Sequence, residues 1–280
     1  MNARPRTLPR RVLLNVAALV VIVCSAFPVY WMVNTALLPG SAIGSETPHL
    51  WPDQFTLRSF ELAITDPGFL PALGMSLAVT VLTVVTALLF AFVASIAVSR
   101  YRFRSRKAFI IAILVIQMIP AEAMIISTFR VLDGWHLLNS IVGLGAVYIA
   151  MVLPFTIWTL RGFVNGVPAD LEEAAMIDGC SRSGAFWRVT FPLLAPGLVA
   201  TGIFGFIQAW NEFVFALVIM TRPEARTLPI WLQSFVQATK ATDWAVVMAG
   251  STLMAIPVIV FFLFVQGRMT GGLVSGAVKG

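Results

Sequence analysis

Six long apolar runs, separated by shorter polar segments, dominate the pattern along the 280 residues of this chain. A helix needs about 20 apolar residues to cross the hydrocarbon core of a bilayer, and each run reaches that length. Backbone amides in hydrocarbon need partners within the protein, so the runs are expected to be helices rather than strands. The pattern predicts an all-α integral membrane protein with six transmembrane helices, at roughly Val12–Leu37, Ala72–Val98, Phe109–Phe129, Leu137–Leu160, Pro196–Met220 and Val246–Gln266.

Composition supports a membrane protein. Hydrophobic residues make up 59% of the chain and charged residues 11%, and the mean hydropathy is +0.89. A soluble domain is about half apolar and about a quarter charged. The alternative, a soluble protein with an unusually large core, lacks the charges to cover its surface. We interpret residues 1–280 as a single transmembrane domain whose first apolar run is a retained helix rather than a cleaved signal peptide.

The distribution of charge predicts the orientation of the chain. A net charge of +6 is compatible with nucleic-acid binding, but the basic residues cluster at the ends of the apolar runs and form no basic face. With the N-terminus inside, fourteen of the 19 Lys and Arg residues are cytoplasmic. We therefore expect both termini in the cytoplasm and no nucleic-acid partner. The five external exceptions are Arg58, Arg130, Arg222, Arg226 and Lys240.

The sequence offers few groups for catalysis or metal binding. Two cysteines, Cys24 and Cys180, cannot build a disulfide framework, and the histidines His49 and His136 are too few for a metal site. No phosphate-binding Gly-Lys-Ser/Thr loop, nucleophile elbow or zinc-binding His-Glu-x-x-His occurs. We expect neither catalytic residues nor a bound metal on this chain.

The predicted cytoplasmic loop, residues 161–195, reads as a helix, a glycine break and a second helix. Pro168 suits a helix start, and Gly179 suits its end. Ser181 or Ser183 can cap the second helix, which is expected to end before Pro192. The helix dipole favours the three acidic residues in the first turn of the first helix: Asp170, Glu172 and Glu173.

The same loop resembles a known motif. Glu173-Ala174-Ala175, then Gly179 after three residues, then Val189-Thr190-Phe191-Pro192 after nine more, is similar to the EAA motif of permease subunits in binding-protein-dependent ABC importers. Local composition alone favours an ordinary amphipathic interfacial helix, but the full spacing favours the family. The resemblance implies a coupling helix that docks on a cytoplasmic ATPase. The implied coupling residues are Glu172, Glu173, Ala174, Ala175, Asp178 and Gly179.

Further segments resemble the carbohydrate type of this family, similar to the smaller membrane subunit of the maltose importer. They are Phe55-Thr56-Leu57, Trp210-Asn211-Glu212-Phe213, Thr242-Asp243-Trp244 and the glycine-rich end Gly271–Gly280. The resemblance implies a type I ABC importer permease fold. It also implies that the tail, residues 267–280, reaches between two ATPase subunits through Gly276, Lys279 and Gly280. By composition alone the tail reads as a flexible terminus.

Two acidic residues inside the apolar runs, Glu122 and Glu212, are candidates for the substrate pathway. A carboxylate at mid-bilayer costs about 2.5–3.5 kcal/mol on insertion scales, so it normally faces a cavity or a partner. Trp210 and Asn211 adjoin Glu212, and an aromatic ring beside hydrogen-bonding groups suits a sugar. The alternative is that these carboxylates join neighbouring helices structurally.

The last external loop is the candidate contact for a solute-binding protein. The resemblance implies this role for residues 228–244, and the alternative is a solvated connector. The polar side chains available there are Gln233, Gln237, Lys240 and Asp243.

These observations together predict the membrane-spanning subunit of an ATP-driven importer for a sugar or glycoside, in the cytoplasmic membrane of a bacterium. The resemblance implies no cofactor on this chain, with ATP and Mg on two partner ATPases. It also implies a second related permease and an extracytoplasmic solute-binding protein. The alternatives are an importer of a non-sugar solute, an ion-driven secondary transporter, and a membrane enzyme acting on a lipid-linked sugar.

Overall fold

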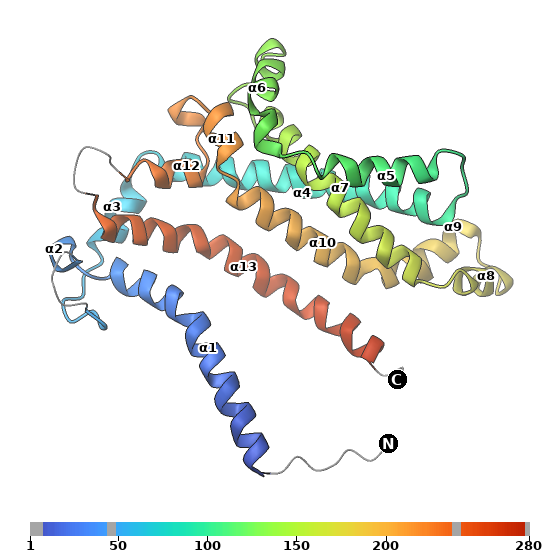
Figure 1. Cartoon of the computed structure of the whole chain (residues 1–280), viewed down its shortest axis with the longest axis horizontal. Coiled ribbons are helices and arrows are strands. Elements are labelled where there is room, and N and C mark those ends of the chain that lie inside the picture. The colour runs from blue at the N-terminus through green and yellow to red at the C-terminus, as the bar shows by residue number, and fades with distance from the viewer. Residues whose placement is uncertain (1–7, 44–48, 237–241, 278–280) are drawn as a thin grey trace. The chain divides into compact units, whose positions relative to one another are not determined.

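The computed structural model describes residues 8–43, 49–236 and 242–277, and within these ranges the chain forms helices and turns without strands (Figure 1). Five helices are long and apolar enough to span a membrane, and a bent pair of shorter helices supplies a sixth candidate. The predicted all-helical membrane fold is thereby confirmed. Contacts divide the chain into two compact units, which we call the bundle unit (Pro67–Trp231 with Pro257–Gly280) and the terminal unit (Met1–Asp66 with Leu232–Ile256).

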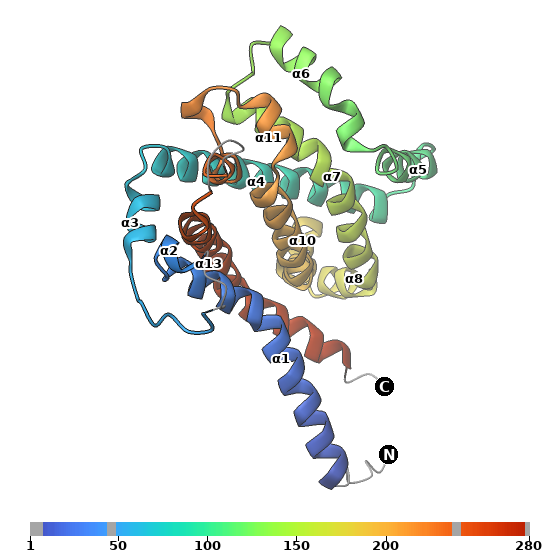
Figure 2. The ribbon, with the colours of Figure 1, turned by 60° about the vertical axis from the view of Figure 1, so that its left-hand side comes forward.

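Three long helices that pack against one another form the centre of the bundle unit: α4 (Phe69–Arg100), α7 (Ile141–Gly166) and α10 (Phe191–Asn211) (Figure 2). Small residues repeat every three or four positions along the buried face of α4 and let the helix backbones approach closely. Those residues are Ala72, Ser76, Thr80, Thr83, Ala87, Ala91 and Ser95.

Glycines permit the same close approach between the other helix pairs. A Cβ added at Gly145 of α7 would lie 2.8 Å from Leu82 of α4, and one added at Gly205 of α10 would lie 3.3 Å from Val152 of α7. Lipid tails are as apolar as leucine, so burial alone does not join helices in a membrane, and tight packing has to do so.

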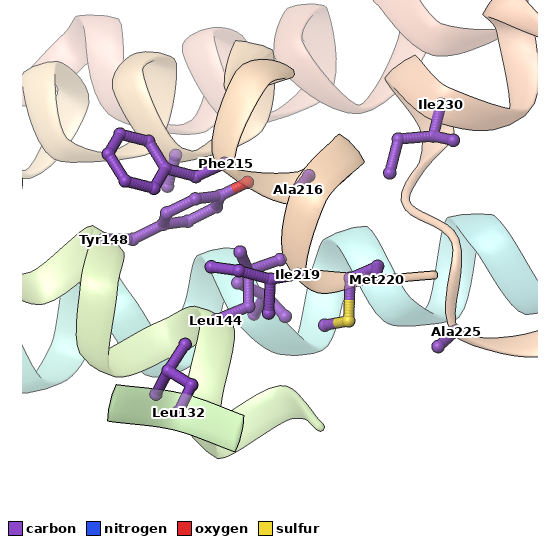
Figure 3. Packing of buried hydrophobic residues seen from close by; sticks show 11 residues of the cluster. Leu132, Leu144, Tyr148, Phe215, Ala216, Ile219, Met220, Ala225 and Ile230 are labelled. Atoms are coloured by element: carbon purple, nitrogen blue, oxygen red, sulfur yellow. The ribbon is translucent and has the colours of Figure 1, made fainter. Parts of the chain in front are cut away.

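The bundle unit also contains shorter elements, of which α5 packs alongside α7 (Figure 1). A buried hydrophobic cluster joins α6, α7 and α11, with Leu144 beside Ile219 and Tyr148 beside Phe215 (Figure 3). The short elements are α5 (Arg106–Ile116), η1 (Ala121–Met124), α6 (Ile125–Gly134), α8 (Asp170–Ile177), α9 (Arg182–Ala185), η2 (Phe186–Thr190), α11 (Val214–Ile219), η3 (Pro223–Ala225) and α12 (Leu228–Gln233).

Two predicted spans differ from single helices. The third, Phe109–Phe129, stops at Ile116 and resumes at residue 121 with a bend of 89°. Pro120 explains this break, because it lacks an amide hydrogen and disfavours helical geometry in the residue before it. The fifth, Pro196–Met220, ends at Asn211, and the segment after it forms the separate helix α11.

The second helix predicted within residues 161–195 does not end before Pro192, contrary to the prediction. Helices α9, η2 and α10 follow one another in a 30-residue apolar segment, Arg182–Asn211. The turn η2 is π-helical, and the amide of Phe191 bonds to the carbonyl of Phe186. We attribute the continuity to this wider turn, which makes room for a proline ring that a regular α-helical turn would exclude.

The terminal unit contains α1 (Leu8–Ala36), α2 (Gly40–Ile43), α3 (Arg58–Thr65) and the first part of α13 (Trp244–Ala277). Side chains near the end of α1 hold the following loop: Asn34 donates to the carbonyl of His49 at 2.8 Å, and the Tyr30 hydroxyl donates to the carbonyl of Leu50. The side chain of Asp243 accepts from the amide of Ala245 at 3.1 Å and so caps α13.

We predict opposite effects of alanine at two glycines. A Cβ at Gly197 of α10 would lie 2.5 Å from Cγ of Phe163, whereas nothing lies within 4 Å of a Cβ at Gly162. Overpacking costs about 1–3 kcal/mol, and replacing an unconstrained helical glycine gains about 0.5–1 kcal/mol. The midpoint of thermal unfolding in detergent should fall for Gly197→Ala and not for Gly162→Ala. Equal midpoints would contradict the close packing of α7 and α10.

Candidate functional site

Residues 168–190, which we call the knuckle, are fixed to the end of the helical bundle by a charged contact. One carboxylate oxygen of Glu172 in α8 accepts from the hydroxyl of Thr190 at 2.7 Å. The same oxygen lies 3.3 Å from a guanidinium nitrogen of Arg100, the last residue of α4. That nitrogen also donates to the carbonyl of Val167 at 3.0 Å. The contact thus joins α8, η2 and residue 167 to α4.

The turn between the two knuckle helices requires glycine. Gly179 has φ of +90°, a conformation that side-chain-bearing residues rarely adopt. Its amide bonds to the carbonyl of Met176, and the next amide, that of Cys180, bonds to the carbonyl of Ala175. Helix α8 therefore ends in a left-handed cap, as the sequence predicts. The hydroxyl of Ser181, rather than that of Ser183, caps α9 by accepting from the amide of Gly184 at 3.1 Å.

The outer face of the knuckle is acidic and apolar. Glu173, Ala174 and Asp178 are exposed, as is Gly179, whereas Ala175 is half-buried. The side chain of Ile177 is 87% exposed, a degree unusual for a large apolar residue. An exposed apolar side chain on the same short segment as exposed acidic groups suits a surface that docks on a basic groove of another protein.

A cavity of about 970 Å³ lies toward the ends of α7 and α10 that are far from the knuckle, and it is large enough for an oligosaccharide. Its walls come from residues 116–135, from α7 and from the end of α10 through Phe215. Its lining combines aromatic rings with hydrogen-bonding groups. The aromatic residues are Trp135, Tyr148, Phe155, Phe204, Phe213 and Phe215, and the polar ones include Gln117, Glu122, Ser127, Thr128, Gln208, Asn211 and Glu212.

Both helix breaks described above open onto this cavity. Gln117 and Ile119 in the first break line it, as do Glu212 and Phe213 in the second. Irregular backbone at membrane depth persists only where it is buried in protein or lines a water-filled space. The two breaks therefore indicate a hydrated cavity.

Glu212 holds the second break together. Its carboxylate accepts from the amide of Phe215 at 2.8 Å and from the amide of Ala216 at 3.0 Å. It also accepts from the hydroxyl of Tyr148 in α7 at 2.7 Å. Figure 3 shows Tyr148 next to Phe215 and Ala216. Glu212 thus caps α11 and connects it to α7, which is the structural role considered above as the alternative to a place in the substrate pathway. Glu212 also lines the cavity.

The other pathway candidates divide into two groups. Glu122 on η1 and Asn211 are exposed and line the cavity. Trp210 does not line it: its side chain is 1% exposed and stacks on Phe206, with ring centroids 5.6 Å apart. Trp210 is therefore a packing residue within this chain. The rings available to stack on a sugar are instead those that line the cavity.

Sequence reasoning missed several lining residues. Gln208 lies three and four positions before Asn211 and Glu212, so helical spacing could have placed all three on one face. Trp135, Tyr148 and Phe155 belong to other segments of the chain, and no local pattern joins them to Glu122.

The candidate residues between 228 and 244 and those of the C-terminal tail lie only partly within the described residues. Gln233 is exposed at the end of α12, and Asp243 caps α13 while remaining exposed. Gly276 lies in the last turn of α13. Gln237, Lys240, Lys279 and Gly280 lie outside the described residues.

Helices long enough to span a membrane, a cavity lined by apolar, aromatic and a few polar groups, and a helical knuckle at the other end of the bundle are typical of a membrane transport subunit. The family model "Binding-protein-dependent transport system inner membrane component" matches residues 87–270. The chain belongs to this family.

Individual relatives and a solved structure agree with the family. The chain is 46% identical to the diacetylchitobiose uptake system permease protein DasC of Streptomyces coelicolor, over 98% of this chain and 99% of that protein. It is 32% identical to the trehalose/maltose transport system permease protein MalG of Thermococcus litoralis, over 97% of this chain and 98% of that protein. The fold matches a subunit of a bacterial ABC transporter that imports the acidic polysaccharide alginate, with a TM-score of 0.78 and 23% identity, over 95% and 99% of the two chains. The predicted permease fold is confirmed.

We predict that Glu212 contributes to stability and that Asn211 does not. Glu212→Ala removes the acceptor of two amides and the Tyr148 hydroxyl, at a cost of about 1–3 kcal/mol. Asn211→Ala removes only a bond from an exposed amide to the carbonyl of Ile207. The unfolding midpoint in detergent should fall for Glu212→Ala and stay unchanged for Asn211→Ala. A fall of equal size in both variants would contradict the capping role.

Two adjacent carboxylates of the knuckle, Glu172 and Glu173, should also differ in their contribution to stability. Glu172→Gln weakens the contacts with Arg100 and Thr190. The side chains of Glu172 and Arg100 are each only 20% exposed, so the change should lower the free energy of unfolding by about 1–2 kcal/mol. Glu173→Gln alters an exposed side chain and should leave the unfolding midpoint unchanged. Limited proteolysis of the knuckle should accelerate only for Glu172→Gln. The reverse order would show that Glu173, not Glu172, anchors the knuckle.

Proposed function

We propose that this chain forms half of the translocation pathway of an ATP-driven sugar importer in the cytoplasmic membrane of a bacterium. Its partners are a second, related permease, two ATPase subunits that bind ATP and Mg, and an extracytoplasmic solute-binding protein. Both termini are cytoplasmic in this assignment, which places the knuckle inside and the cavity toward the outside. The observation that carries the proposal is the knuckle itself, in which the EAA spacing coincides with a helix, a left-handed glycine turn and a second helix.

Coupling follows from how the knuckle is attached. The ATPase pair contacts the outer face around Glu173, Asp178 and Gly179, and any displacement of that face reaches the bundle through Glu172 and Arg100. The turn η2 passes the same displacement directly into α10. ATP binding shifts the helices between inward- and outward-open states only if the ATPases hold the knuckle more tightly in one of them.

The sugar assignment rests on the cavity and on the relatives. Aromatic rings stack on the C–H faces of sugars, while amides, hydroxyls and carboxylates bond to their hydroxyl groups. The lining of the cavity contains both kinds of group. The names of the two relatives, for diacetylchitobiose and for trehalose or maltose, support an oligosaccharide substrate.

The test is ATP-dependent uptake of diacetylchitobiose by proteoliposomes that contain the complete complex. Glu173→Lys reverses a charge on the docking face, and Gly179→Val forbids the turn conformation, so each should lower uptake about tenfold or more. Gly179→Asn should retain more uptake than Gly179→Val, because asparagine tolerates a positive φ. Co-purification with the ATPase subunits should fall in the same order.

The control is Asp133→Lys, an equal charge reversal on α6, away from the knuckle and outside the cavity lining. It should leave uptake and ATPase association at wild-type levels. Normal uptake by both Glu173→Lys and Gly179→Val would contradict the coupling role. Uptake by the wild-type chain alone on an ion gradient would establish a secondary transporter instead.

A further inference from the structure

The charge of the cavity lining is one-sided. Among the described residues that line it, two are carboxylates, Glu122 and Glu212, and none is Lys, Arg or His. The basic residues nearest along the chain, Arg130 and His136, do not contribute to its walls. A saccharide in this cavity therefore meets negative charge and neutral donors or acceptors, without a cation to pair with an acidic group.

The carboxylates of Glu122 and Glu212 differ in how many hydrogen-bond or ion-pair partners they have within the described chain. Glu212 accepts from two backbone amides at the start of α11 and from the Tyr148 hydroxyl. Glu122 lies exposed in the short turn η1, and no ion pair within the described chain neutralises it. Glu122 is thus the charge in this cavity that is most available to a solute.

The surroundings strengthen that charge. The lining of the cavity as a whole is mostly apolar and aromatic, which lowers the local dielectric and focuses the field of a charge in the opening. An acidic sugar entering here would have a like charge near Glu122 and no compensating cation, and the two could not both remain ionised without a penalty. A neutral sugar meets no such penalty, and an amino sugar gains an attraction.

We propose that this cavity selects its solute by charge, accepting neutral and amino-bearing oligosaccharides and rejecting uronic-acid oligosaccharides, with Glu122 as the selecting residue. The inference rests on the proposed function, since it specifies the class of sugar. The fold alone does not decide the matter: the alginate importer has the same fold at 23% identity, and its cargo is acidic. Selection here is repulsive, in that the wrong solute meets an unpaired like charge.

The first experiment measures the field in the cavity without any sugar. Ser127 lines the cavity, so Ser127→Cys in a chain with Cys24→Ser and Cys180→Ser places one thiol there. In the purified complete complex, the thiol reacts with a cationic trimethylammonium methanethiosulfonate or an anionic sulfonate methanethiosulfonate. Relative to a free thiol, the cationic reagent should be favoured about tenfold. Glu122→Gln should reduce that preference, and Glu122→Lys should reverse it.

Asp133→Asn is the matched control, because it removes a carboxylate from α6 that does not line the cavity. It should leave the reagent preference unchanged. The partner subunits are the same in every variant, so the change between variants reports Glu122 alone. A preference that is absent in the wild type, or that is insensitive to Glu122→Lys, overturns the inference.

The second experiment asks whether the field selects the solute. Proteoliposomes of the complete complex receive diacetylchitobiose, its deacetylated counterpart chitobiose, whose free amines are cationic, or anionic digalacturonic acid. The ratio of chitobiose to diacetylchitobiose uptake should fall about tenfold in Glu122→Lys, while Asp133→Asn matches the wild type. The solute-binding protein is unchanged, so its own selectivity cancels in this comparison. Digalacturonic acid should give no uptake in the wild type.

The outcomes separate this inference from the proposed function. If the wild-type complex takes up none of the three sugars with ATP, the proposed function fails, and the reagent preference still reports the cavity field. If diacetylchitobiose is taken up but the ratio of chitobiose to diacetylchitobiose uptake is unchanged in Glu122→Lys, the proposed sugar importer is supported and charge selection by Glu122 is wrong. Wild-type uptake of digalacturonic acid equal to that of diacetylchitobiose would also refute it.

Discussion

The need to satisfy every backbone amide away from water governs this structure. In hydrocarbon, helices meet that need by themselves, so the breaks at residues 117–120 and 212–213 demand an explanation. Both breaks open onto one cavity, and at the second of them the carboxylate of Glu212 takes the place of the missing helical carbonyls. The break that Pro120 causes in the third span opens onto the cavity, where its backbone is not in contact with lipid. The break before α11 opens onto the same cavity, and the carboxylate of Glu212 satisfies two of the amides that this break frees.

Packing of the bundle has the same origin. Because lipid offers no hydrophobic drive for helices to associate, the long helices meet through small residues, with glycines in α7 and α10 and a stripe of alanine, serine and threonine in α4. Such contacts are short-ranged and shape-dependent, so displacement of one helix end must move its neighbours or open a gap between them. A knuckle fixed to α4 and continuous with α10 is well placed to exploit that rigidity.

The knuckle and the cavity lie at opposite ends of α7 and α10, and each contains two carboxylates with different surroundings. At the knuckle, Glu172 contacts Arg100 and fixes the position, while its neighbour Glu173 is exposed. At the cavity, Glu212 holds a helix break, while Glu122 is exposed to the cavity. In each place one acidic residue stabilises the fold, and we propose that the second is the one used for recognition.

The sequence alone determined the helical membrane fold, the approximate spans and the EAA loop, because these depend on hydrophobic length and on local spacing. It also located the glycine turn, since φ of +90° leaves few other residues possible. Tertiary structure decided which carboxylates are held by partners, why Trp210 packs in the interior, and which aromatic rings line the same cavity as Glu122. Those outcomes depend on contacts between segments far apart in the chain, and such contacts leave no periodic signal in any one of them.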